Sequence, residues 1–116
     1  MFLTDIEAVL QEIDSHVDYG MVDKEHMETM WNYIVFNRTG VTYSTNKTGA
    51  SDKFDVHIIR ENYVPEGLDE EIVTKLCELP GVRISGDAEI NYAKKPGTNI
   101  VVELLTIHFV RARKRQ

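Results

Sequence analysis

The last apolar stretch of this chain, Asn99 to Arg111, constrains the fold more than any other segment. Successive side chains of an extended strand point to opposite faces, and in this stretch both faces carry apolar residues. A strand of that kind is normally covered on both faces. We therefore expect a long strand with helices on one side and a partner subunit on the other. The two sides hold, respectively, Val101, Leu105, Ile107 and Phe109, and Val102, Leu104 and Val110.

Two other segments have the helical period instead. Apolar residues recur at spacings of three and four from Thr4 to about Val17, which predicts an amphipathic helix, and Thr4 with Glu7 matches a capping box. A second stripe runs over Leu68–Leu79 and is stopped by Pro80–Gly81. Both helices need a sheet face to bury these stripes.

The remaining apolar runs are short, rich in β-branched and aromatic residues, and separated by turn-forming residues. Together with the two helices they predict an α+β fold, with two helices packed on one face of a four- to five-stranded mainly antiparallel sheet. Loops are expected over 18–29 and 45–52, and a turn over 37–40. The predicted strands are Met30–Phe36, Val41–Ser44, Phe54–Arg60, Val82–Ser85, Ile90–Ala93 and Asn99–Arg111.

Length and composition favour one cytosolic domain over residues 1–110, followed by a short basic tail over 111–116. No run reaches the 18 or so apolar residues of a membrane span, and the first residues lack a signal-peptide layout. Cys77 is the one cysteine, so an internal disulfide is excluded, and its place beside the second helical stripe predicts a buried structural thiol.

Charge is distributed unevenly along the chain. The net charge is -6, but four of the 13 basic residues lie in the last six positions, so the rest holds 9 basic against 19 acidic residues, or -10. A cationic tail on an acidic body favours contact with a neighbouring copy over contact with phosphate. The subunit-contact candidates are this tail and a polar loop: Arg111, Arg113, Lys114 and Arg115, with Thr45, Asn46, Lys47 and Thr48.

The sequence offers no convergent set of reactive residues, so we expect no catalytic, cofactor-binding or metal-binding residues and no small-molecule substrate. His16 and His26 are ten positions apart around a loop. His57 and His108 lie on separate predicted strands that can be neighbours, with Glu103 or Asp55 near, yet a cross-strand polar pair explains them without a metal. The glycines are scattered singly beside turns, which does not match a phosphate-binding loop.

Aromatic residues on the predicted strands raise the possibility of a base-stacking surface. Such surfaces combine aromatic side chains with a positive groove, and only Arg38, Lys53 and Arg60 lie near these strands. We therefore favour packing in the core or at an interface. The aromatic set is Trp31, Tyr33, Phe36, Tyr43, Tyr63 and Tyr92.

Three segments, 31–38, 57–66 and 98–109, together with the order of the predicted elements, resemble the small neck proteins of long-tailed bacteriophages. The likeness spans nearly the whole chain and is strongest to the tail-terminator and tail-completion group. A head-tail joining protein or another minor capsid component of the same neck is an open alternative within the resemblance.

The resemblance implies a virion structural protein without enzymatic activity or cofactor, assembled in the bacterial host cytoplasm and located at the neck between tail and head. It implies a homo-oligomeric ring of about six copies that caps the tail tube and docks to the head connector. The partners would be tail-tube and head-connector proteins, with no membrane, and with nucleic acid near only through the DNA channel.

Two other classes of function stay open from the sequence. A small nucleic-acid-binding regulator would use the basic C-terminus and exposed aromatic residues, and its binding would weaken steeply with salt. A small enzyme would need a site completed by a partner at a subunit boundary.

Overall fold

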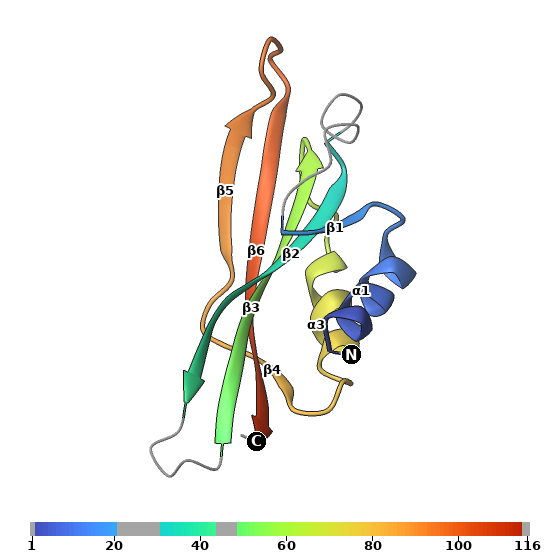
Figure 1. The fold of residues 1–116 in the computed structure, drawn as a ribbon. Coiled ribbons are helices and arrows are strands. Elements are labelled where there is room, and N and C mark those ends of the chain that lie inside the picture. Colours follow the sequence, from blue (N-terminus) through green and yellow to red (C-terminus); the bar gives the residue numbers. More distant parts are fainter. Residues whose placement is uncertain (1, 21–30, 44–48, 115–116) are drawn as a thin grey trace.

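The computed structural model describes residues 2–20, 31–43 and 49–114, and over these ranges it has two helices and a six-stranded, mostly antiparallel sheet (Figure 1). The predicted α+β class with two helices is confirmed, while the sheet has six strands instead of four or five. The helices are α1 (Phe2–Ile13) and α3 (Leu68–Leu76), and the strands are β1 (Val17–Tyr19), β2 (Tyr33–Tyr43), β3 (Gly49–Glu61), β4 (Val82–Ile84), β5 (Glu89–Lys94) and β6 (Val101–Lys114).

Strand β6 organises the sheet, as the alternation of its apolar residues predicted. The strand order is β1-β2-β3-β6-β4. Strands β4 and β5 share the same edge of β6: β4 pairs with residues 109–111 of β6 and β5 with residues 101–106. Every pairing is antiparallel except that of β1 with β2. Because β2, β3 and β6 are 11, 13 and 14 residues long, the molecule is elongated, with extents of 52 × 25 × 23 Å.

One face of the sheet carries the main hydrophobic core. Alternate residues of β2, β3 and β6 point to this face, and both helices supply their buried side chains to the same cluster. Burial of these side chains from water is the main stabilisation of the fold. The members that are almost fully buried are Ile6 and Leu10 of α1, Ile72 and Leu76 of α3, and Ile34, Phe36, Phe54, Val56, Ile58 and Phe109 of the sheet.

The opposite face has a smaller hydrophobic cluster. Tyr33, Val35, Ile59 and Val102 form it, with Trp31 and Leu104 packed against them, and Val102 is only 3% exposed. The second apolar side of β6 is therefore largely buried within one chain. A partner subunit, which the sequence led us to expect on this side, is not needed to cover it.

Helix α1 differs from its prediction at both ends. It includes Phe2, whose ring meets that of Phe54 edge-on at 5.5 Å, so Thr4 lies inside the helix and the predicted capping box is wrong. The helix stops at Ile13 because Asp14 is held by Arg60 at 2.6 Å and also accepts a hydrogen bond from the His16 amide. The chain then enters strand β1, which the sequence pattern did not predict.

The strands β2 and β3 are longer than the sequence predicted. The turn expected over 37–40 is instead a β-bulge within β2, where the register with β3 shifts between Arg38 and Gly40. Residues 49–52, predicted to be loop, begin β3 because the end of β6 extends the ladder beside them. The rest of that predicted loop lies outside the described residues.

Helix α3 ends earlier than predicted, at Leu76, and this reverses the expectation for the single cysteine. Cys77 is the C-cap residue, and its amide donates to the Val73 carbonyl. The thiol is exposed, because the apolar stripe of the helix turns Ile72 and Leu76 toward the core instead. The prediction of a buried structural thiol is wrong.

Gly81 provides a test of how closely the turn before β4 approaches β6. Its φ of +79° is left-handed, and an added Cβ would lie 2.8 Å from the Ala112 carbonyl oxygen. Gly97 has a similar φ of +76° with nothing within 4 Å, so it is a matched control. We expect Gly81→Ala to lower the free energy of unfolding by about 2 kcal/mol or more and Gly97→Ala by about 1 kcal/mol, measured by urea denaturation. Equal losses would contradict the close approach.

Candidate functional site

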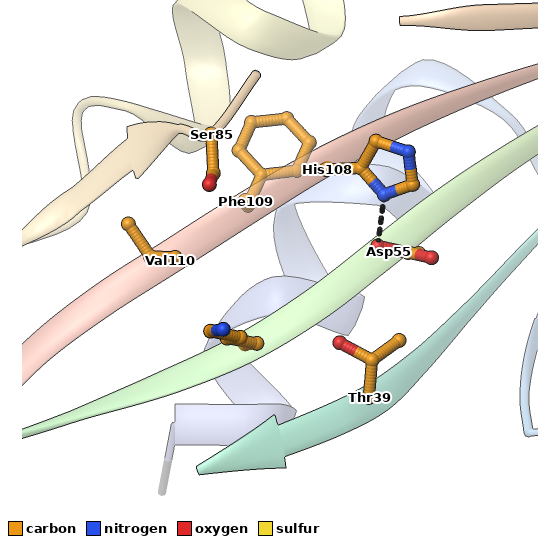
Figure 2. A pocket seen from close by; sticks show the side chains of 7 residues that line it. Thr39, Asp55, Ser85, His108, Phe109 and Val110 are labelled. Atoms are coloured by element: carbon orange, nitrogen blue, oxygen red, sulfur yellow. Dashed lines mark hydrogen bonds and ion pairs between the residues drawn. The ribbon is translucent and has the colours of Figure 1, made fainter. Parts of the chain in front are cut away.

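The most organised polar cluster lies on the sheet face opposite the helices, where β2, β3 and β6 run side by side. His57 and Asp55 of β3 stand directly opposite Thr106 and His108 of β6. The two histidines therefore lie on adjacent strands with Asp55 near, as predicted, but they are diagonal neighbours and each ring bonds to other side chains. Figure 2 shows the hydrogen bond between Asp55 and His108 across the two strands.

His57 is hydrogen-bonded through both ring nitrogens. Its Nε2 lies 2.9 Å from Asn37 Oδ1, and its Nδ1 lies 2.9 Å from Thr106 Oγ1. Because the amide oxygen of Asn37 only accepts, the proton is on Nε2, and Nδ1 accepts from the Thr106 hydroxyl. Burial lowers the pKa of His57, Asp55 opposes this, and the neighbouring His108 adds to it. His57 is thus a neutral ring that links three strands.

His108 has the opposite electrostatic environment. Its Nδ1 lies 2.7 Å from Asp55 Oδ1 and its Nε2 lies 2.7 Å from Glu89 Oε1. The hydrogen bonds to Asp55 and Glu89 raise the pKa of His108 against a smaller opposing effect of desolvation. An imidazolium donates from both nitrogens, so the charged form fits both carboxylates. His108 thereby connects β3, β6 and the segment that begins β5.

A shallow hollow of about 190 Å³ lies beside His108. It has hydroxyl, ammonium and carboxylate groups within a small volume, so it is polar in character (Figure 2). Both histidines already use their ring nitrogens within the chain, so neither presents an unshared lone pair to this hollow. The lining residues are Thr39, Lys53, Asp55, Ser85, His108, Phe109 and Val110.

The remaining residues weighed for a metal or catalytic site are apart from this cluster. Glu103, the alternative partner for the histidines, instead accepts a hydrogen bond from the Val64 amide at 2.8 Å. His16 is exposed between α1 and β1, and His26 lies outside the described residues. Across residues 2–20, 31–43 and 49–114 we find no group of three or more His, Cys, Asp or Glu side chains placed to hold a metal ion.

The predicted basic tail does not begin at residue 111, because β6 continues to Lys114. The guanidinium of Arg111 lies 4.1 Å from the Phe2 ring centroid, and Arg113 Nε lies 2.9 Å from Asp52 Oδ2. Two of the four cations expected to contact another subunit thus interact within the chain. Lys114 is the last residue of β6, and Arg115 and the loop residues Thr45, Asn46, Lys47 and Thr48 lie outside the residues whose placement is described.

The aromatic residues considered as a stacking surface are divided among different environments. Phe36 is in the main core, and Tyr33 and Trp31 are in the smaller cluster on the other face. Tyr43 lies at one end of the long strands, while Tyr63 and Tyr92 lie toward the other. No common platform for bases forms from these side chains within the described ranges.

Comparison with known proteins adds no family assignment: neither a protein-family model nor a curated protein sequence matches this chain. Neither described helix is long and apolar enough to cross a bilayer.

The opposite pKa shifts of the two histidines predict opposite pH dependence. Because the pKa of His108 is raised in the folded state, its contribution to the free energy of unfolding is complete below about pH 6.5 and is lost as pH rises through the raised value. Because the pKa of His57 is lowered, its contribution to the free energy of unfolding is lost on acidification. We expect His108→Gln to cost about 1 kcal/mol more at about pH 5.5 than at about pH 9. His57→Gln should cost more at the higher pH.

The measurement is urea denaturation of the two variants and the unchanged protein at both pH values. Parallel curves for His57→Gln and His108→Gln would show that the two rings do not differ in charge state.

Proposed function

We propose that this chain is a structural subunit that acts by assembling with copies of itself and with companion proteins, in the neck of a long-tailed phage or prophage. The observation that carries the proposal is the exposure of large apolar side chains on the outer strands. Ile84, Ile90 and Tyr92 are 52%, 53% and 65% exposed. Exposed large apolar side chains that gather on one face of a protein favour an interaction surface.

The three exposed side chains share one face of the sheet. Ile84 stands opposite Phe109 and Ile90 opposite Leu105, and both of these β6 residues belong to the main core. Tyr92 is two residues along β5 from Ile90 and so points to the same side. We call Ile84, Ile90 and Tyr92 the apolar strip. Figure 1 shows β5 at the margin of the sheet, on the side of β6 away from β3.

The polar cluster also favours binding over catalysis. His57 and His108 have each ring nitrogen in a hydrogen bond to a side chain of the same chain. A general base needs a lone pair within reach of the proton that it removes. In this arrangement both rings tie strands together, which is what a rigid assembly component requires.

The specific place in a phage neck rests on the sequence resemblance. Its three segments lie mainly on β2, β3 and β6, which are neighbouring strands, so the likeness follows a contiguous part of the fold. On this basis the subunit forms a ring of about six copies that caps the tail tube and docks to the head connector. A tail terminator is the first candidate, and a head-tail joining protein of the same neck is the alternative.

The ring proposal predicts a multimer in solution. We expect light scattering of the purified chain, alone or mixed with tail tubes, to give a mass of about six copies. A chain that stays monomeric in both conditions would count decisively against the ring.

Charge reversal tests the end of β6 without shortening it. Truncation from Arg111 would remove strand residues and the partners of Phe2 and Asp52. The double variant Lys114→Glu/Arg115→Glu keeps the strand, and we expect it to weaken assembly most at low salt, where charge interactions are least screened. Arg83→Glu, an exposed reversal on β4, is the control and should assemble normally. Equal assembly of both variants would remove these two cations from the contact.

A further inference from the structure

Strand β5 is an edge strand whose outer side has no neighbouring strand in the described part of the chain. Its pairing is with β6 alone, and all six of its residues are exposed. An edge strand presents a row of amide and carbonyl groups that another strand can pair with.

The hydrogen-bond pattern identifies the outward groups. The Lys95 amide donates to the Ile100 carbonyl, and the Val101 carbonyl accepts from Asn62 on the β3 side. Backbone direction alternates along a strand, so the odd-numbered residues of β5 bond to β6. The residues with outward amide and carbonyl groups are therefore Ile90, Tyr92 and Lys94.

The edge has neither a bulge nor a proline to protect it, and its charged residues, Glu89 and Lys94, lie at its two ends. Bulges, prolines and inward charges are the common devices, and β2 has such a bulge between Arg38 and Gly40 on the other side of the sheet. Strand β5 has regular pairing over Glu89–Lys94 with no register shift and no proline. It also bears two members of the apolar strip.

We propose that β5 pairs antiparallel with β5 of a second copy, about a two-fold axis at Tyr92, so that the two sheets become continuous. In this register Tyr92 faces Tyr92 of the other copy and Ile90 faces Lys94. Each of these residues has its backbone groups directed outward, and the register uses all of Glu89–Lys94.

The charges of the strand are complementary in this arrangement. Glu89 lies at one end of β5, and Lys94 and Lys95 lie at the other. An antiparallel copy places Glu89 opposite Lys95, whereas a parallel copy would place Glu89 beside Glu89. Lys95 already pairs with Glu61 at 2.8 Å, and Glu89 with His108 at 2.7 Å, so the contact would join two existing ion pairs.

The same contact covers part of the apolar strip. On the helix-bearing face Tyr92 lies opposite Tyr92 of the second copy at the axis, and Ile90 of each copy is the diagonal neighbour of the other copy's Tyr92. Aromatic and aliphatic cross-strand pairs stabilise antiparallel sheets. The phenol of Tyr92 is hydrogen-bonded to Glu103, which stands opposite it on β6, and this bond raises the pKa of Tyr92 and fixes the position of its ring.

A head-to-tail contact between β5 and β2 fits less well. Strand β5 pairs with the Val101–Thr106 part of β6, while the part of β2 that β1 leaves uncovered lies level with the other end of β6. Joining these two edges would shift each copy along the strands and yield an open fibre. A two-fold contact closes on itself and joins two copies only.

This inference deepens the proposed assembly function by naming one contact between copies; the ring contact must use another surface. A disulfide tests the register directly. Residues of a hydrogen-bonded antiparallel pair have Cα atoms about 5.5 Å apart, within the disulfide range. We expect Tyr92→Cys in a Cys77→Ser background to form a covalent dimer under mild oxidation.

Tyr63→Cys in the same Cys77→Ser background is the matched control, since Tyr63 is exposed but lies outside β5. It should stay largely monomeric on a denaturing gel. Equal cross-linking of the two variants, or none for Tyr92→Cys, would overturn the proposed register.

Ile90→Pro tests the edge without a cysteine. The Ile90 amide points outward, so proline removes a donor to the second copy and leaves the bonds to β6 intact. In sedimentation velocity, we expect the particles of Ile90→Pro to have a lower mass than those of the unchanged protein, because the two-fold contact is lost. If Ile90→Pro has the same ring mass as the unchanged protein, the β5 contact is wrong and the ring proposal is unaffected. If the unchanged protein is a monomer, both proposals are wrong.

Discussion

The pairing of β3 with β6 is the constraint on which the rest of the structure depends. It runs without interruption from Gly49 opposite Lys114 to Glu61 opposite Val102. This ladder places Phe54, Val56 and Ile58 beside Leu105, Ile107 and Phe109, which is the surface that both helices pack against. It also fixes Asp55 and His57 opposite His108 and Thr106. A register slip of one residue would reverse the two faces and bury the polar set.

Local periodicity was sufficient to predict much of this fold. The alternation in 99–111 identified β6 and its two apolar sides, and the stripes in 4–17 and 68–79 identified both helices, although each ends earlier than its stripe. Strand β1 was missed because three residues are too few to show a period. The bulge at Thr39 was mistaken for a turn, since Asn37–Gly40 has turn composition whether or not the strand continues.

The polar cluster was predictable in part, for a similar reason. Strand alternation put His57 and His108 on polar sides, so their meeting with Asp55 followed once the strands were adjacent. Glu89 and Asn37 were missed because their contributions depend on the β5–β6 register and on the length of β2. Glu103 was a plausible partner by sequence proximity, but it is an odd-numbered residue of β6 and lies on the helix-bearing face with Leu105.

Arg111 and Arg113 were misassigned to a tail because clustered charge looks the same in a free segment and at the end of a paired strand.

The central ladder also has a consequence for how the molecule folds. Asp52 and Arg113, which pair near one end of it, are 61 positions apart in the chain. Contacts between such distant positions require closing a large loop before they repay its entropy, and domains dominated by them fold slowly. During synthesis, α1, β2, β3 and α3 leave the ribosome before the strand that completes their core. The apolar faces of β2 and β3 are therefore exposed to water until β6 has been synthesised. Correct folding requires that β6 pairs with β3 before a strand of another molecule does.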